Sequence, residues 1–238
     1  MSLYLTRLTA SYDVVAKANI RDTYDWHQKI WKAFEGLLQN CSGKGKYPKG
    51  TKVENQNNAP PDFLTRLDHK NDHVQVLIVS SLVPSRPLWL PDHGCATWQS
   101  KEIKDTYFKH PSYRFQLLAN PTKKEKATGK RKPLIKREEL VEWILNKGKV
   151  GGFTVVEDSL KTMARPVERF WKEKGSNFGT HHAVEFQGVL HVSDPVQLQH
   201  TFQHGIGKAK AFGFGLLCLA PLSLTTQIST QTPERKTQ

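Results

Sequence analysis

Cysteine, acidic side chains and long apolar runs are all scarce in this chain of 238 residues. The three cysteines, Cys41, Cys95 and Cys218, are scattered and include no Cys-x-x-Cys pair. This pattern argues against a disulfide framework and a zinc ribbon, and it favours a reducing compartment such as the cytoplasm. No charged segment followed by an apolar stretch opens the sequence, so we expect no secretory signal. The longest apolar run, near residues 214–222, is too short to span a bilayer.

Because acidic residues are few, the chain is strongly basic. It has 35 Lys and Arg against 22 Asp and Glu, which gives a formal net charge of +13. Such a charge indicates an acidic partner, most simply nucleic acid. A basic membrane-surface protein would carry a long amphipathic basic helix, and the sequence shows none. The charge alone does not separate an RNA-binding from a DNA-binding protein.

Glycine gathers in one stretch, Gly205–Gly215, which reads Gly-Ile-Gly-Lys-Ala-Lys-Ala-Phe-Gly-Phe-Gly. Glycine lets a backbone approach a ligand closely, and lysines in the same loop suit a polyanion. The stretch matches neither the dinucleotide fingerprint nor the Walker loop. The alternative is a tight helix-to-strand connection. The candidate phosphate-binding residues here are Gly205, Gly207, Lys208, Lys210, Gly213 and Gly215.

Hydrophobic periodicity predicts an α+β protein with two similar units. We expect strands over 3–8, 63–67, 74–79, 113–119, 151–156, 182–192 and 216–220, and helices over 22–38, 138–146 and 194–204. Each unit approximates the order β-α-β-β-α-β, so the predicted fold is two tandem ferredoxin-like (RRM-like) domains. We place the domains at 1–90 and 112–222, a linker at 91–111, and a disordered polar tail at 223–238.

Three basic segments interrupt these elements. Residues 41–61 read as a lysine-bearing loop, and residues 123–137 contain eight Lys or Arg with the single acid Glu125. A third basic segment spans 161–174. Runs of charge are often only solvated surface, but a run between a strand and a helix favours a docked surface. The RNA-binding candidates in these segments are Lys130, Arg131, Arg165, Arg169, Lys172 and Lys174.

The first predicted helix carries candidate catalytic residues. Tyr24 lies three residues before His27 and shares its face, while Lys32 lies five residues after it. Histidine suits proton transfer because its reference pKa lies near working pH. From spacing alone, ordinary packing on an apolar helix face is the favoured interpretation. His200 and His204 have a zinc-compatible spacing, but no third ligand is evident, so we expect no metal site.

Four stretches resemble one known family, the CasE family of CRISPR repeat-processing endoribonucleases of type I-E systems. They appear in the family order and cover the chain from Leu3 to about Ala220. The stretches are Tyr24-Asp25-Trp26-His27, Leu118-Ala119-Asn120-Pro121-Thr122 with Gly129-Lys130-Arg131, Phe186-Gln187-Gly188-Val189-Leu190, and Gly205–Gly215.

This resemblance implies two ferredoxin-like domains and cleavage of precursor CRISPR RNA beside a repeat stem-loop, without metal or other cofactor. It implies that the product stays bound within the Cascade surveillance complex of a prokaryotic cytoplasm. His27 and Tyr24 match the family's catalytic histidine and tyrosine, and Lys32 matches a catalytic lysine. A basic hairpin near 161–174 would insert into the RNA stem. The alternative is a non-catalytic RNA-binding scaffold subunit of the same fold, and the pairing of Tyr24 with His27 favours the nuclease.

Overall fold

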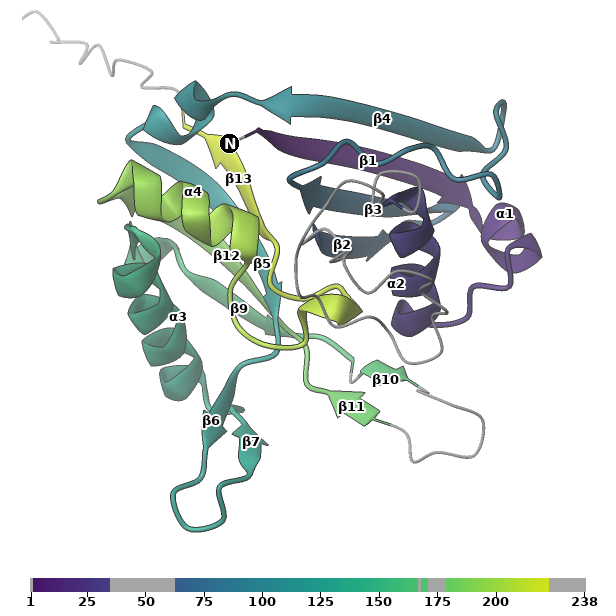
Figure 1. Cartoon of the computed structure of the whole chain (residues 1–238). Coiled ribbons are helices and arrows are strands. Elements are labelled where there is room, and N and C mark those ends of the chain that lie inside the picture. Colours follow the sequence, from purple (N-terminus) through teal and green to yellow (C-terminus); the bar gives the residue numbers. More distant parts are fainter. Residues whose placement is uncertain (1, 35–62, 167, 171–178, 223–238) are drawn as a thin grey trace, which may run out of the picture.

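The computed structural model describes residues 2–34, 63–166, 168–170 and 179–222, and two antiparallel sheets with helices against them make up this part of the chain (Figure 1). The expected features of 41–61, the tail from 223, and the helix end near residue 38 lie outside the described residues. Of 168–170 and 179–180 only the backbone is described.

The first sheet has the strand order β2-β3-β1-β4. Its strands are β1 (Leu3–Ser11), β2 (Phe63–His69), β3 (His73–Ser80) and β4 (Ala96–Ile103), and the helices α1 (Tyr12–Lys17) and α2 (Thr23–Trp31) follow β1. This order is that of a ferredoxin-like sheet. Residues 81–95, all of them described, contain no helix, so the second helix of the unit is missing.

The segment predicted as a linker, 91–111, contains a strand of the first sheet. Strand β4 pairs with β1 from Leu3↔Ile103 to Ala10↔Ala96 and forms the edge of the first sheet. Only Ala96 and Ile103 are buried along β4, and the residues between them are mostly exposed. An edge strand with this polar composition lacks the alternation that identifies a strand in sequence. A short 3₁₀ turn, η2 (Asp105–Lys109), then leads into the second unit.

The second sheet has the order β13-β5-β12-β8, with β9 also paired to β12. Its strands are β5 (Ser112–Ala119), β8 (Phe153–Val155), β9 (Lys161–Ala164), β12 (Val184–Val192) and β13 (Leu217–Pro221), with a 3₁₀ turn η3 (Glu157–Ser159) between β8 and β9. Helices α3 (Arg137–Gly151) and α4 (Pro195–His204) lie against one face of this sheet (Figure 1). The prediction of tandem ferredoxin-like domains is therefore confirmed.

Two hairpins project from the second unit. The basic stretch expected as a loop forms β6 (Thr122–Lys124) and β7 (Arg131–Pro133), an arm directly before α3. The strand expected over 182–192 is β12, which begins at Val184, and a separate short strand before it, β11 (Gly179–His181), pairs with β10 (Glu168–Phe170). Both arms extend beyond the body of the sheet (Figure 1).

The buried apolar residues form two clusters, and one of them belongs to both units. Phe115, Phe186 and Leu217 of the second sheet share a cluster with Leu3 and Leu64 of the first. Residues of α3 and α4 complete it. The other cluster lies between α1, α2 and the first sheet. The two units therefore meet across a continuous apolar contact, which fixes the position of β2 relative to the second sheet.

Candidate active site

Helix α2 places Tyr24 and His27 on one side. Its N-terminus is capped by Asp22, whose side chain accepts a hydrogen bond from the backbone N–H of Asp25 at 2.9 Å. An N-cap of this kind satisfies an otherwise unpaired amide and fixes where the helix begins. At 100° per residue, Tyr24 and His27 lie about 60° apart around the helix. The expected start of this helix is thus confirmed.

The ring of His27 is held by aromatic packing. It stacks on Phe63 of β2 with ring centres 5.0 Å apart and an angle of 24° between the planes. The imidazole Nδ1 is buried and has no hydrogen-bond partner among the described residues. Burial lowers the pKa of His27 from 6.5 to about 4. In the RNA-free protein the imidazole is therefore neutral at pH 7, which is the form that accepts a proton.

Lys32 is placed differently from Tyr24. It is the C-cap residue of α2 and is exposed. Five residues at 100° each put it about 140° around the helix from His27. The helix therefore does not aim Lys32 at the imidazole, and its assignment to the site rests on the family resemblance alone.

The glycine stretch packs against the first unit. Between α4 and β13 it contains a 3₁₀ turn, η4 (Lys210–Phe212), which contacts both α2 and β2. A Cβ at Gly213 would meet Leu67 Cδ1 at 3.2 Å, and φ there is +82°. At Gly205 a Cβ would meet Leu64 Cδ1 at 2.9 Å. Glycine is needed at these positions because the loop passes close to β2 in a left-handed conformation.

The two lysines of this loop have different environments. Lys208 is exposed. Lys210 is partly buried, and its Nζ donates a hydrogen bond to the carbonyl oxygen of His204 at the C-terminus of α4. A cation at a helix C-terminus satisfies a free carbonyl and the helix dipole. Of the two predicted phosphate ligands, only Lys208 extends toward solvent.

Sequence reasoning missed an aromatic chain that joins the second unit to Tyr24. The ring of Phe212 lies 6.5 Å from that of Tyr24 and 4.9 Å from that of His181. Asn120 Nδ2 is 2.8 Å from His181 Nδ1. Asn120 lies within a stretch quoted for the family resemblance, but nothing in the sequence places His181 near the first helix. The pairing of β10 with β11 brings it there.

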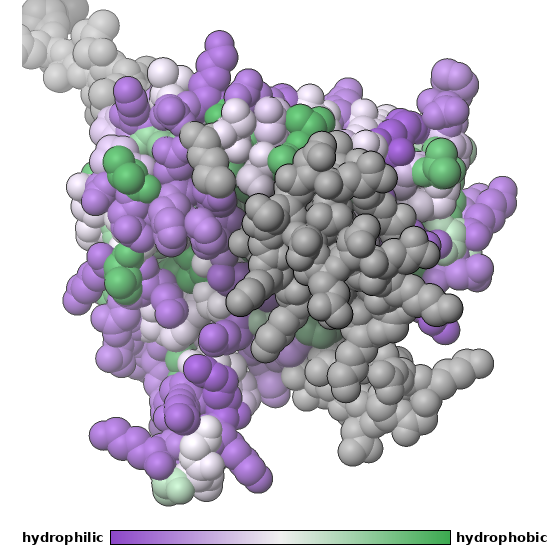
Figure 2. Space-filling view, viewed as in Figure 1, coloured by the Kyte–Doolittle hydropathy of each residue, from purple (hydrophilic) through white to green (hydrophobic). Residues whose placement is uncertain are grey.

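The β6–β7 arm carries the densest described group of cations. Lys130 and Arg131, the RNA-binding candidates here, are exposed, and Arg131 Nη1 donates to Thr122 Oγ1 at 3.4 Å. Two other lysines are neutralised: Lys123 pairs with Glu139 and Lys132 pairs with Glu125. The arm is almost entirely hydrophilic on its visible face (Figure 2). The cations that remain at its tip suit a phosphate backbone.

The predicted cations of 161–174 are only partly described. The side chain of Arg165 is 51% exposed and is ion-paired with Glu185. Arg169 lies on β10, where only the backbone is described. Lys172 and Lys174 fall outside the described residues. The role of these residues in RNA binding stays a prediction.

The rings of His200 and His204 stack with centres 4.1 Å apart. Within the described ranges, no three His, Cys, Asp or Glu side chains form a group that could hold a metal ion. Among the helices that the structure describes, none is long and apolar enough to cross a membrane.

Comparison with known proteins identifies one consistent group. A family model described as "CRISPR associated protein" matches residues 3–221. The chain is 38% identical over 232 residues to the "CRISPR-associated endoribonuclease Cse3" of Thermus thermophilus, and 28% identical over 233 residues to the "CRISPR system Cascade subunit CasE" of Escherichia coli K12. Each alignment covers 92% of this chain and 100% of the relative.

A solved structure has the same fold throughout. It is "Structure of Thermus Thermophilus Cse3 bound to an RNA representing a pre-cleavage complex", with a TM-score of 0.70 and 25% sequence identity. The likeness covers 93% of this chain and 100% of that chain.

Proposed function

This chain belongs to the CRISPR associated protein family, and we propose that His27 and Tyr24 on α2 perform its chemistry. Its relatives are named as an endoribonuclease and as a Cascade subunit, and one is solved with RNA in a pre-cleavage complex. The activity is therefore RNA cleavage. The partners are CRISPR RNA and the other Cascade subunits, and we place the protein in the prokaryotic cytoplasm.

The proposed reaction is internal transesterification. The ribose 2′-oxygen attacks the adjacent phosphorus in line, the bond from phosphorus to the 5′-oxygen breaks, and the product ends in a 2′,3′-cyclic phosphate. Neutral His27 takes the proton from the 2′-hydroxyl, and solvent protonates the departing 5′-oxygen. Tyr24 orients the 2′-hydroxyl by a hydrogen bond. Positive charge near the phosphorane stabilises the transition state, and Lys32 is the family-matched candidate for it.

One observation carries this assignment: the imidazole of His27 is neutral and has a buried nitrogen that no described residue satisfies. An unsatisfied buried polar atom costs about 1–3 kcal/mol. A histidine serving only as core packing would be expected to have a partner for that nitrogen. Because Tyr24 lies on the same side of α2, the pair is positioned for proton transfer and substrate orientation.

The test uses a CRISPR repeat stem-loop RNA in the presence of EDTA. We expect the wild-type protein to cut it and to leave a 2′,3′-cyclic phosphate. His27→Ala should lower the single-turnover rate at least 100-fold while the Kd for RNA stays within a few-fold, because RNA binding is spread over many cations. An RNA with 2′-deoxyribose at the cut site should bind and stay intact.

Cleavage by His27→Ala near the wild-type rate would exclude the catalytic assignment. Binding without any cleavage by the wild type would instead identify the protein as a scaffold subunit.

A further inference from the structure

A buried carboxylate lies where the two sheets meet. Glu185 of β12 is 1% exposed, and its partner Arg66 of β2 is 3% exposed. They are the only two charged side chains classed as buried among the described residues. Arg66 Nη2 donates to Glu185 Oε1 at 3.1 Å, and this bond links residues 119 positions apart in the chain.

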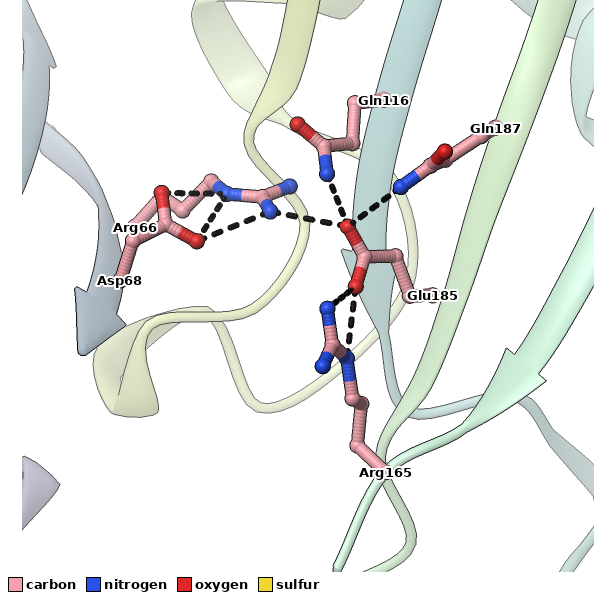
Figure 3. A network of polar contacts seen from close by, with 6 residues as sticks. All are labelled: Arg66, Asp68, Gln116, Arg165, Glu185 and Gln187. Atoms are coloured by element: carbon pink, nitrogen blue, oxygen red, sulfur yellow. Dashed lines mark hydrogen bonds and ion pairs between the residues drawn. The ribbon is translucent and has the colours of Figure 1, made fainter. Parts of the chain in front are cut away.

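Glu185 is the centre of a larger network (Figure 3). Its Oε1 also accepts hydrogen bonds from Gln116 and Gln187, while its Oε2 accepts from both Nε and Nη2 of Arg165. Burial by itself would raise the pKa of Glu185, but the bonds from Gln187, Arg165 and Arg66 outweigh it and hold the pKa at about 2. The carboxylate is therefore charged throughout the working pH range.

Arg66 connects this carboxylate to the candidate active site. Its Nε and Nη2 bond both oxygens of Asp68 on the same strand, which fixes the guanidinium relative to β2. Three residues earlier on β2, Phe63 stacks on the ring of His27. Leu67, which follows Arg66 on β2, lies against Gly213 of the glycine stretch.

The other side of the carboxylate connects to an arm. Arg165 lies between β9 and β10, at the base of the β10–β11 hairpin, and its backbone N–H bonds Ala183 O at 2.8 Å. The hairpin ends in His181, whose ring packs on Phe212. One carboxylate thus links β2, whose Phe63 stacks on His27, to the base of the hairpin whose His181 packs on Phe212 beside Tyr24.

Stability is a poor explanation for this arrangement. Desolvating two charges offsets most of their attraction, and replacing a buried ion pair by apolar side chains is often neutral or stabilising. The Nη1 of Arg66 is also buried and has no hydrogen-bond partner among the described residues. Directional bonds to a fixed carboxylate do, however, specify the relative position of the two sheets.

We propose that Glu185 is a positioning residue for RNA cleavage: through Arg66 and Arg165 it holds α2 and the β10–β11 hairpin in the relation that brings bound RNA to His27. This proposal rests on the proposed function. Because Arg165 is ion-paired with Glu185, we also expect Arg165 to contribute less to RNA affinity than an unpaired surface arginine would.

The experiment distinguishes an effect on the placement of α2 and the β10–β11 hairpin from an effect on the stability of the folded protein. Cleavage of the repeat RNA is measured under single-turnover conditions at saturating protein, and binding is measured with the 2′-deoxy RNA. The variants are Glu185→Gln, Arg66→Met, Arg66→Lys and the double variant Arg66→Met/Glu185→Met, each with its melting temperature. Arg7→Met is the matched control, because Arg7 is an exposed strand arginine that bonds Gln99 at 2.6 Å in the first sheet.

We expect Glu185→Gln to cut at least ten-fold more slowly with a Kd within three-fold of the wild type. The double variant removes both buried charges, and the two partners that it leaves, Asp68 and Arg165, are 23% and 51% exposed to water, so it should regain the melting temperature but not the rate. Arg66→Lys should recover part of the rate lost in Arg66→Met, because lysine keeps the positive charge but lacks the paired N–H donors of a guanidinium. Arg7→Met should cut normally.

A double variant that melts and cuts like the wild type would overturn the proposal, because the pair would then serve no positioning role. A double variant that does not fold would also overturn it, since the pair would then be needed for folding itself. Absence of cleavage by the wild-type protein would refute the proposed function instead, so the two failures are distinguishable.

Discussion

His27 combines two features that a packing residue does not need: a depressed pKa and a buried ring nitrogen that no described residue satisfies. The lowered pKa follows from burial, because a ring that lies against Phe63 loses water without gaining a hydrogen bond from the described residues. The folded protein therefore holds the imidazole in its neutral form. Binding of an anionic phosphate near it would favour the protonated form, so RNA bound as we propose would raise the pKa of His27.

The depressed pKa predicts how stability depends on pH. In the unfolded chain His27 titrates near 6.5, and in the folded chain near 4. Between these values the unfolded state binds the additional proton, so the free energy of unfolding falls as the pH decreases from 6.5 to 4. From pH 7 to pH 5 the loss is at most about 2 kcal/mol.

Urea denaturation of the wild type and of His27→Gln at both pH values measures this contribution. We expect the variant to lose less stability on acidification, because glutamine does not titrate. Equal losses in the two proteins would show that the imidazole is not desolvated in the folded state.

The position of the proposed pair, Tyr24 and His27, on one side of a helix could be predicted from sequence, and its surroundings could not. The spacing of Tyr24 and His27 is local, and the helical period alone puts them on one side of α2. The ring of Phe63 that stacks on His27 comes from β2, which is far along the chain from α2. Lys210 was predicted as a phosphate ligand, and the sequence does not show that its Nζ donates a hydrogen bond to the carbonyl oxygen of His204, six residues earlier.

At the scale of elements, the glycine stretch connects α4 to β13 and also packs against β2 of the first unit. Helices α2 and α4 were predicted from hydrophobic periodicity, and each begins at an aspartate N-cap, Asp22 and Asp194, which is also a local signal. Strand β4 was missed because an exposed edge strand lacks a hydrophobic alternation. The close approach of η4 to β2 was also beyond sequence reasoning, although the glycines that permit it were visible.

Gly213→Val should disrupt this approach, and Gly94→Val provides the matched control. Both glycines have φ of +82°, but a Cβ at Gly94 meets nothing within 4 Å, whereas at Gly213 it meets Leu67. Backbone strain alone destabilises by about 1–3 kcal/mol in each variant. We expect Gly213→Val to melt at a lower temperature than Gly94→Val and to cut repeat RNA more slowly, because η4 and the ring of Phe212 move away from Tyr24.

Thermal melting and single-turnover cleavage test this pair of variants. If the two variants melt and cut alike, the contact with β2 does not matter and the stretch is only a connection.

At the scale of the whole molecule, the two ferredoxin-like units are not independent. The domain boundaries at 90 and 112 followed the symmetry of the predicted elements, which says nothing about what lies between them. In the structure Leu3 and Leu64 belong to the same buried cluster as Phe115 and Leu217. The ion pair of Arg66 with Glu185 crosses the same contact. Sequence periodicity identifies which faces are apolar, but it cannot show that two such faces cover each other.

We therefore expect residues 112–222 alone not to fold cooperatively. Without the first unit, the apolar face of the second sheet that contacts Leu3 and Leu64 meets water, and Glu185 keeps its charge while losing Arg66. Both changes oppose folding. The full chain should unfold in urea in one transition, with coincident curves by tryptophan fluorescence and far-UV circular dichroism, whereas the fragment should show no sigmoidal transition. Co-expression of residues 1–111 with the fragment is the control and should restore the transition. A fragment that unfolds cooperatively by itself would show that the second unit is an autonomous domain and that the shared cluster contributes little to its stability.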